Sequence, residues 1–292
     1  MPPLASPPMT GAAQQVRPRP RWLRALGSEG PPQRLEIAAV PYRLREVFKH
    51  DSWAATALYE APSGALRVVK LHRQAAALGL PLAWLGRRLA RHETRLLQRL
   101  SDLPGIPPLD APPAGEDGRP LANGVARDYI LGAPLGHRQP VGDRFFPALD
   151  DLLRRLHDRG VLYIDLHKRE NIVVSDRGEP FLIDFQISLI WPRWLPRGPL
   201  FQILRRSDLY HLTKHWARCR PDQWSGEGRP AAPPIPWWIH AHRLIARPVR
   251  EFRRRLLVLL GVRAGQGRVE TEHFAEHALR PDLPAAGENQ AA

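Results

Sequence analysis

The chain has 292 residues, of which 43 % are hydrophobic and 25 % are charged, enough for one two-lobed domain or two small ones. Its single cysteine, Cys219, excludes an internal disulfide and suits the cytoplasm, and no stretch approaches the ~20 apolar residues of a membrane span. The net charge of +14 predicts an acidic partner: a nucleic acid, an anionic membrane face or a phosphorylated substrate.

Residues 1–35 are rich in Pro, Gly, Ala and Arg and show no hydrophobic periodicity, so we predict a disordered basic tail. Trp22, Leu23 and Leu26 could instead form a short docking turn within it. The same region lacks the apolar segment of a secretory signal, and none is expected. Residues 265–292 are predicted to form a second, loose tail.

Three strands are predicted after the tail, over Tyr42–Phe48, Ala55–Glu60 and Leu66–Leu71. The third strand carries Lys70, one of only four lysines among the 43 basic residues. A strand lysine is ordinarily a solvated edge residue, so this residue type alone does not indicate a site.

Leu82–Leu100 is predicted to be a helix, because leucines recur along it at helical spacing and form one apolar stripe. Glu93 falls inside that stripe, four residues after Leu89 and three before Leu96. A carboxylate on an apolar face costs free energy unless it is paired. Glu93 is therefore expected either to have a buried partner or to lie at the solvated edge of the stripe.

Gly124–Ile130 is predicted to be a strand and Pro147–Arg159 a helix, with Pro in its first turn and Gly160 just past its end. His157 follows the buried leucine stripe of this helix, and we interpret it as a structural histidine rather than a catalyst.

The most informative stretch is Val161–Ile187, in which three short apolar strands alternate with polar turns: Val161–Ile164, Ile172–Val174 and Phe181–Ile183. Asp165, Asn171 and Asp184 stand where these strands end. A polar residue that ends an apolar run lies at the rim of the core, facing a cleft. Two carboxylates and an amide gathered there suit a hard cation with oxygen ligands, typically Mg²⁺ with phosphates.

Two features near the C-terminus allow more than one interpretation. His211, His215 and Cys219 share a helix face and could ligate Zn²⁺ with His240 or His242, although ordinary amphipathic placement explains the same spacing. The segment Pro248–Arg263 reads as an amphipathic helix with an arginine-rich side. It suits an anionic membrane surface, and equally a helix that packs on the core with solvated arginines.

The central stretch resembles the catalytic core of the protein-kinase-like superfamily. Asp165-Leu166 followed by Asn171 is similar to H-R-D-L-x-x-x-N, and Asp184-Phe185-Gln186 is similar to D-F-G. The amino-acid sequence around Asp165 most resembles that of bacterial lipopolysaccharide-core (heptose/Kdo) kinases and RIO-type kinases. Tyr163 and Gln186 depart from the usual His and Gly, and Asp165 to Asn171 is one position longer than usual, which implies a local bulge.

The resemblance implies an α+β, two-lobed protein-kinase-like fold, with a small N-lobe over residues 36–126 and a larger, mainly helical C-lobe over 127–264. It implies that Lys70, in Arg67-Val68-Val69-Lys70, binds ATP phosphates and pairs with Glu93. Asp165 would be the catalytic carboxylate, and Asn171 and Asp184 would hold Mg²⁺.

The same resemblance places the nucleotide against two backbone segments. Asp128, Tyr129 and Ile130 would meet the adenine of ATP at the hinge. The loop after the first strand has no glycine, so Ser52 and Ala54, with the basic residues before them, must replace the glycine-rich loop. Ser207-Asp208 resembles the start of the helix whose aspartate braces the catalytic loop.

The predicted function is Mg-ATP-dependent phosphoryl transfer to a hydroxyl, most simply of a lipopolysaccharide-type envelope sugar. A RIO-like protein serine/threonine kinase and a nucleotide-binding pseudokinase or scaffold are the alternatives. The expected location is the cytoplasm. Peripheral contact with the inner face of the membrane is a second interpretation of the same sequence. No specific nucleic acid is expected, because the chain carries no nucleic-acid-binding motif.

Overall fold

A computed structural model describes residues 23–76, 79–224, 236, 255 and 258. The predicted tail over 265–292 and residues 1–22 lie outside these ranges, as does the predicted amphipathic helix over 248–263 apart from Arg255 and Val258. Within the described ranges, no helix is long and apolar enough to cross a membrane.

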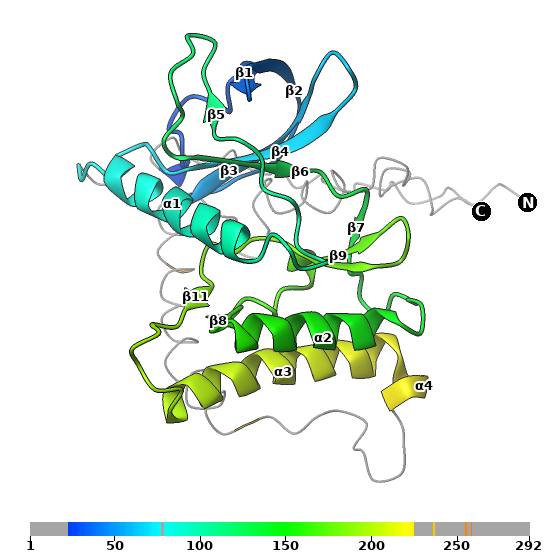
Figure 1. Cartoon of the computed structure of the whole chain (residues 1–292). Helices are drawn as coiled ribbons and strands as arrows, with labels where there is room; N and C mark the ends of the chain where they lie inside the picture. The colour runs from blue at the N-terminus through cyan, green and yellow to red at the C-terminus, as the bar shows by residue number, and fades with distance from the viewer. Residues whose placement is uncertain (1–22, 77–78, 225–235, 237–254, 256–257, 259–292) are drawn as a thin grey trace, which may run out of the picture.

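A six-stranded antiparallel sheet forms the N-terminal part, in the order β5-β1-β2-β3-β4-β6 (Figure 1). Its strands are β1 (Arg34–Ile37), β2 (Val40–His50), β3 (Ala54–Glu60), β4 (Leu66–His72), β5 (Pro113–Ala114) and β6 (Gly124–Asp128). Side chains alternate across the sheet, so Val69 joins an apolar cluster on one face. Its neighbours Val68 and Lys70 point to the opposite face, which carries the candidate site.

The helix α1 (Ala83–Arg99) lies against this sheet and joins it to the rest of the chain. Its last turns bury Leu96, Leu97 and, just beyond the helix, Leu100 in the largest apolar cluster. That cluster also contains the leucines of α2 and the strands that precede the candidate catalytic residues. One continuous core therefore connects α1 to the strands that precede Asp165, Asn171 and Asp184.

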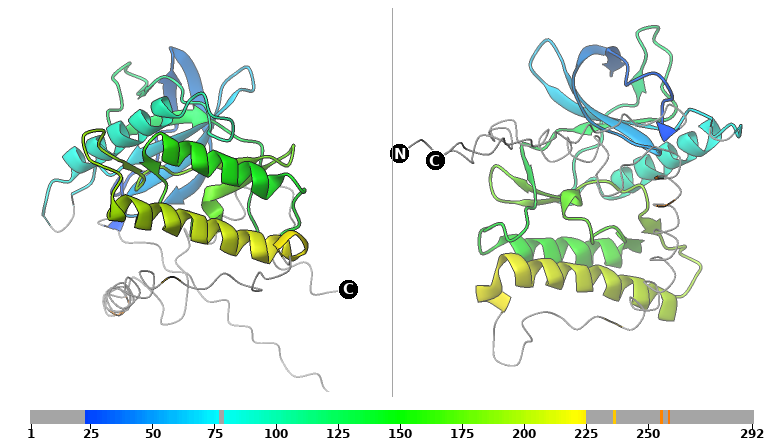
Figure 2. Two further views of the ribbon diagram at one scale, coloured as in Figure 1. Left: turned by 60° about the horizontal axis from the view of Figure 1, so that its bottom comes forward. Right: turned by 180° about the vertical axis from the view of Figure 1, so that it is seen from behind.

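The C-terminal part is built on two helices, α2 (Phe145–Asp158) and α3 (Pro199–Cys219), followed by the short α4 (Pro221–Trp224). The two long helices run side by side, as Figures 1 and 2 agree. Between them and the N-terminal sheet lie two small antiparallel sheets, β10-β9-β7 and β11-β8. Their strands are β7 (Gly132–Pro134), β8 (Val161–Leu162), β9 (Ile172–Ser175), β10 (Pro180–Leu182) and β11 (Leu189–Ile190).

The predicted α+β character is confirmed, and the strands and helices predicted between residues 42 and 183 are present with boundaries shifted by a few residues. The very short strands β5, β7 and β11 and the 3₁₀ turn Arg169–Asn171 were not predicted. Strands of two or three residues carry too little alternation to be recognised. The division into two lobes and its boundaries stay predictions.

The predicted disordered tail is wrong for residues 23–35. Ala25 is fully buried, and its N–H donates to the Asp51 carbonyl at 2.7 Å while its own carbonyl accepts from Gln74 and Ala75. Strand β1 begins at Arg34 and pairs with β2 and β5. Backbone hydrogen bonds to the sheet hold residues 23–35 in place. The composition of residues 1–35 gives no sign of such bonds, so it could not predict that this segment is ordered.

Helix α3 begins at Pro199, eight residues before the predicted start at Ser207. Pro199 stands in the first turn of the helix, where a missing N–H costs nothing. The segment between Asp184 and this helix, residues 185–198, is therefore shorter than expected.

Candidate active site

Lys70 lies at the centre of the candidate site, on the face of β4 that points towards α1. Its Nζ is 3.0 Å from Glu93 Oε2 and 2.7 Å from Asp184 Oδ1. Glu93 is only 3 % exposed, so the pair with Lys70 that the sequence predicted is present and buried. Three segments far apart in the chain thus meet through one ammonium group.

His72 completes this buried group, and the sequence interpretation missed it. Its Nε2 lies 3.0 Å from the same Glu93 oxygen that pairs with Lys70, and its ring is fully buried. Its backbone N–H and carbonyl are both bonded to Asn123. Because His72 follows Lys70 by two residues, strand alternation puts both side chains on one face. The two-residue spacing from Lys70 is therefore the feature of the sequence from which the place of His72 could have been predicted.

Opposite charges dominate the electrostatics of the group. Burial opposes the charged form of Lys70, but the carboxylates of Asp184 and Glu93 outweigh it and raise the pKa of Lys70. Burial likewise favours the neutral form of Asp184, and the ammonium groups of Lys70, Lys49 and Lys168 outweigh it, so the pKa of Asp184 is lowered. Near neutral pH the site therefore holds full charges of both signs.

Asp165 lies in a buried catalytic-type loop after β8 and is 2 % exposed. Its Oδ2 accepts hydrogen bonds from Lys168 Nζ at 2.8 Å and from Asn171 Nδ2 at 2.9 Å. Its Oδ1 accepts no hydrogen bond, although the His167 ring lies 3.2 Å away. Oδ1 is thus the oxygen of this carboxylate that has no hydrogen bond, and it is itself buried.

The extra residue between Asp165 and Asn171 is accommodated by two tight turns. The Lys168 N–H donates to the Asp165 carbonyl, and the Asn171 N–H donates to the Lys168 carbonyl across the 3₁₀ turn. The loop therefore bulges locally, as the sequence predicted. The bulge also turns the Lys168 ammonium back onto Asp165, a contact that was not predicted.

The oxygen atoms left over in this loop fit a hard cation. Asn171 donates hydrogen bonds from its Nδ2 to Asp165, and inside the described part of the chain no hydrogen bond to its Oδ1 is present. Asp184 Oδ1 accepts hydrogen bonds from Lys70 Nζ and from the Gln186 N–H, and no described residue donates a hydrogen bond to Asp184 Oδ2. Amide and carboxylate oxygens are the donors that Mg²⁺ takes together with phosphates and water.

Tyr163, at the position where the kinase-like resemblance expects a histidine, has a definite structural role. Its hydroxyl donates to the Ile183 carbonyl just before Asp184, and its ring packs edge-on against Phe185 at 5.2 Å. The backbone N–H groups of Tyr163 and Ile164 donate to the two oxygens of Asp208, at 2.9 and 2.8 Å. The predicted bracing of the loop by Asp208 is present, and His157, bonded to the same carboxylate at 3.0 Å, is structural as expected.

The three residues predicted to contact the adenine differ in their surroundings. Tyr129 packs on the apolar cluster of Phe48, Leu58 and Val68, on the sheet face that also presents Lys70. Asp128, by contrast, pairs with Arg67, and its N–H donates to the Pro108 carbonyl. Ile130 follows β6 and is half-buried.

The glycine-free loop does not offer the backbone groups that were expected of it. The Ala54 N–H donates to Asp51 Oδ1, and the Ser52 carbonyl accepts from the Arg73 guanidinium at 2.6 Å. Both residues therefore have backbone groups bonded inside the protein.

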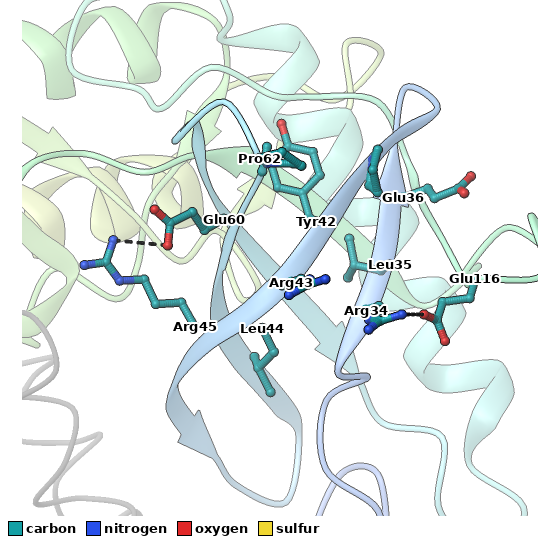
Figure 3. Close-up of a pocket in the computed structure, with 12 residues that line it drawn as sticks. Arg34, Leu35, Glu36, Tyr42, Arg43, Leu44, Arg45, Glu60, Pro62 and Glu116 are labelled. Carbon is teal, nitrogen blue, oxygen red and sulfur yellow. Dashed lines mark ion pairs between the residues drawn. The ribbon is translucent and has the colours of Figure 1, made fainter.

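The groove shown in Figure 3 is a separate feature on the sheet, about 740 Å³ in volume. Three arginines and three glutamates line it, and two of the pairs, Arg34 with Glu116 and Arg45 with Glu60, are 3.6 Å apart. None of the predicted site residues lines this groove, and its charges balance. It is therefore not a candidate for the phosphate site.

His215 contacts the loop after β8 from α3, where its Nε2–H donates to the Leu166 carbonyl at 2.8 Å. The zinc interpretation of this face gains no support: the described residues contain no group of three His, Cys, Asp or Glu that could hold a metal, and His240 and His242 lie outside them.

The stability of the protein is expected to fall as the pH falls below neutrality because of His215. Burial holds the pKa of its imidazole down at about 4, so the unfolded chain takes up a proton at a higher pH than the folded one. Between pH ~6.5 and ~4 the free energy of unfolding should therefore fall by up to about 3 kcal/mol. Urea unfolding at a series of pH values, compared with His215→Gln, measures this difference. The same slope in both proteins would contradict it.

No family model and no curated protein matches the chain. Among solved structures it is similar to the Rio2 kinase from Chaetomium thermophilum, at 16 % sequence identity and a TM-score of 0.44. The match covers 60 % of this chain and 57 % of that chain, so this chain spans less than two thirds of that structure's length. A likeness of this size carries no argument about function.

Proposed function

We propose that the protein is a Mg-ATP-dependent phosphotransferase that acts on a hydroxyl group. The observation that carries the proposal is the junction at Lys70, whose ammonium bridges the carboxylates of Glu93 and Asp184. A buried Lys–Glu pair beside a second carboxylate is an arrangement that neutralises phosphate groups and a bound metal ion together. It agrees with the motif pattern of the sequence at the same residues.

Each charged group then has a separate task. Lys70, held in place by Glu93, would bind ATP phosphates, and Asn171 and Asp184 would hold Mg²⁺ through the oxygens that remain unbonded. When bound, Mg²⁺ would neutralise charge on the phosphates. Asp165 would orient the acceptor hydroxyl through its carboxylate and accept its proton.

The acceptor is proposed to be a lipopolysaccharide-type envelope sugar. Only residues 185–198 separate Asp184 from α3, which leaves a short segment where protein kinases build a platform for a peptide. The net charge of +14 also favours a phosphorylated acceptor. A protein hydroxyl remains the alternative acceptor, and contact with an anionic membrane surface remains a prediction.

Replacing Asp165 with Ala should leave nucleotide binding within a few-fold of the parent and lower phosphoryl transfer by ~10²-fold or more, because the side chain faces the acceptor. Transfer of labelled phosphate from Mg-ATP to core oligosaccharides and to generic protein acceptors measures this. Asp176→Ala, which removes an exposed carboxylate in the turn between β9 and β10, is the matched control. Metal-independent nucleotide binding with no transfer to any acceptor would instead favour a pseudokinase.

A further inference from the structure

The loop between β2 and β3 carries an anion of its own, the carboxylate of Asp51. Asp51 Oδ1 accepts hydrogen bonds from the N–H groups of Trp53, at 2.7 Å, and Ala54, at 3.0 Å. The Asp51 N–H donates to the Ala54 carbonyl, and the Asp51 carbonyl accepts from Ala25. These N–H groups are the kind that a glycine-rich loop turns towards ATP. Here a carboxylate already uses them.

Lys49 precedes Asp51 by two residues in the chain. A bulge in β2 places the Lys49 side chain on the sheet face that carries the candidate site. Val47 pairs with Ala57 and Lys49 with Thr56, so one extra residue, Phe48, interrupts the register. A bulge of this kind turns the following side chain to the other face of the sheet. Without it, Lys49 would share the face of Val47.

After the bulge, Lys49 stands in line with Lys70. Lys49 pairs with Thr56 on β3, and Thr56 pairs with Lys70 on β4, so the three residues form one row across neighbouring strands. Directly opposite residues in a sheet present their side chains on the same face. The two ammonium groups therefore lie on the face that carries Asp184, whose pKa Lys49 helps to lower.

The use of lysine itself points in the same direction. Only four of the 43 basic residues are lysine, and three of them, Lys49, Lys70 and Lys168, act on the charges of Asp184 and Asp165. Arginine replaces lysine almost everywhere else in the chain. A compact ammonium on a flexible stem suits a point contact with phosphate, which the wider guanidinium does not reproduce.

We propose that Lys49 is a second phosphate-binding residue, which replaces the backbone contacts of a glycine-rich loop with a side-chain charge. Asp51 closes the loop through its own hydrogen bonds, and its Oδ2 lies 2.9 Å from the Lys49 ammonium, a contact that a phosphate would replace. This inference rests on the proposed function, because it assigns a ligand within the same nucleotide site. It explains how a loop without glycine can serve that site.

The test compares nucleotides with and without phosphate. Dissociation constants for Mg-ATP and for adenosine are measured by calorimetry on the full chain and on Lys49→Met. The variant should bind ATP about tenfold more weakly or worse, because it lacks one charge-assisted contact, and should bind adenosine as the parent does. Arg45→Met, which removes an exposed cation from the same strand, is the matched control and should change neither constant.

A second variant separates contact with phosphate from mere support of the loop. Asp51→Asn keeps an oxygen for the Trp53 and Ala54 N–H groups and removes a negative charge, so ATP should bind as tightly as in the parent or more tightly. Equal loss of ATP affinity in Asp51→Asn and Lys49→Met would show that Lys49 only braces the loop, and would overturn the inference. So would ATP binding by Lys49→Met at the affinity of the parent. If the parent itself binds ATP no better than adenosine, the proposed function fails, and this inference fails with it.

Discussion

Replacing Asp184 with Asn is expected to lower ATP turnover by roughly a thousandfold or more while the protein stays folded. The carboxylate contributes the oxygen proposed to hold Mg²⁺ and also one of the two negative partners of Lys70. Asparagine has nearly the same shape, so packing is retained. Lys70 keeps its pair with Glu93, and the buried ammonium is therefore not left without a counter-charge.

Turnover is followed by release of labelled phosphate from Mg-ATP, and folding by circular dichroism and by the midpoint of thermal unfolding. Asp176→Asn, the same exchange at an exposed turn position, should match the parent in both measurements. Equal turnover by Asp184→Asn and the parent would exclude Asp184 from the metal site. A large drop in the unfolding midpoint of Asp184→Asn would show that the carboxylate is needed mainly for the stability of the fold.

The burial of Glu93 predicted that this carboxylate has a partner, and the kinase-like resemblance named Lys70 as that partner. A glutamate within a leucine stripe needs a partner, and the structure supplies both Lys70 and His72. The same logic located Asp165, Asn171 and Asp184, which stand where short apolar strands end. Positions of this kind are visible in a sequence, because the change from apolar to polar marks the rim of the core.

Other features could not be predicted, because they depend on contacts between distant segments. The amide groups beside Asp51 are ordinary backbone, and only the fold shows that its carboxylate uses them. The order of residues 23–35 comes from hydrogen bonds to β2 and to the segment after β4 rather than from composition. A bulge such as that at Phe48 also leaves no clear signal, since it changes the register without changing the residue types.

Two residues of the candidate site have a strained backbone conformation. Ile164 and Asp184 adopt positive φ values of 67° and 64°, a region that a β-branched residue such as isoleucine rarely enters. Each such residue costs on the order of 1–3 kcal/mol and persists only where its surroundings hold it. For Ile164 the restraint is Asp208, which accepts both its N–H and that of Tyr163.

Replacing Asp208 with Ala should therefore destabilise the protein by about 3–5 kcal/mol, the largest loss expected for a single substitution here. Asp208 is fully buried, and its removal leaves two backbone N–H groups and His157 without their acceptor. Urea unfolding measures the loss, and Asp151→Ala, at an exposed carboxylate of α2, should stay within about 0.5 kcal/mol of the parent.

Asp208→Asn keeps one acceptor oxygen and should fall between Asp208→Ala and the parent in stability. Because the strained Ile164 precedes Asp165 directly, Asp208→Asn should also lower phosphoryl transfer more than it lowers nucleotide binding. A stable Asp208→Ala variant with the transfer rate of the parent would show that the loop holds its conformation without this carboxylate. The strain at Ile164 would then have to be balanced by the packing of Tyr163 against Phe185.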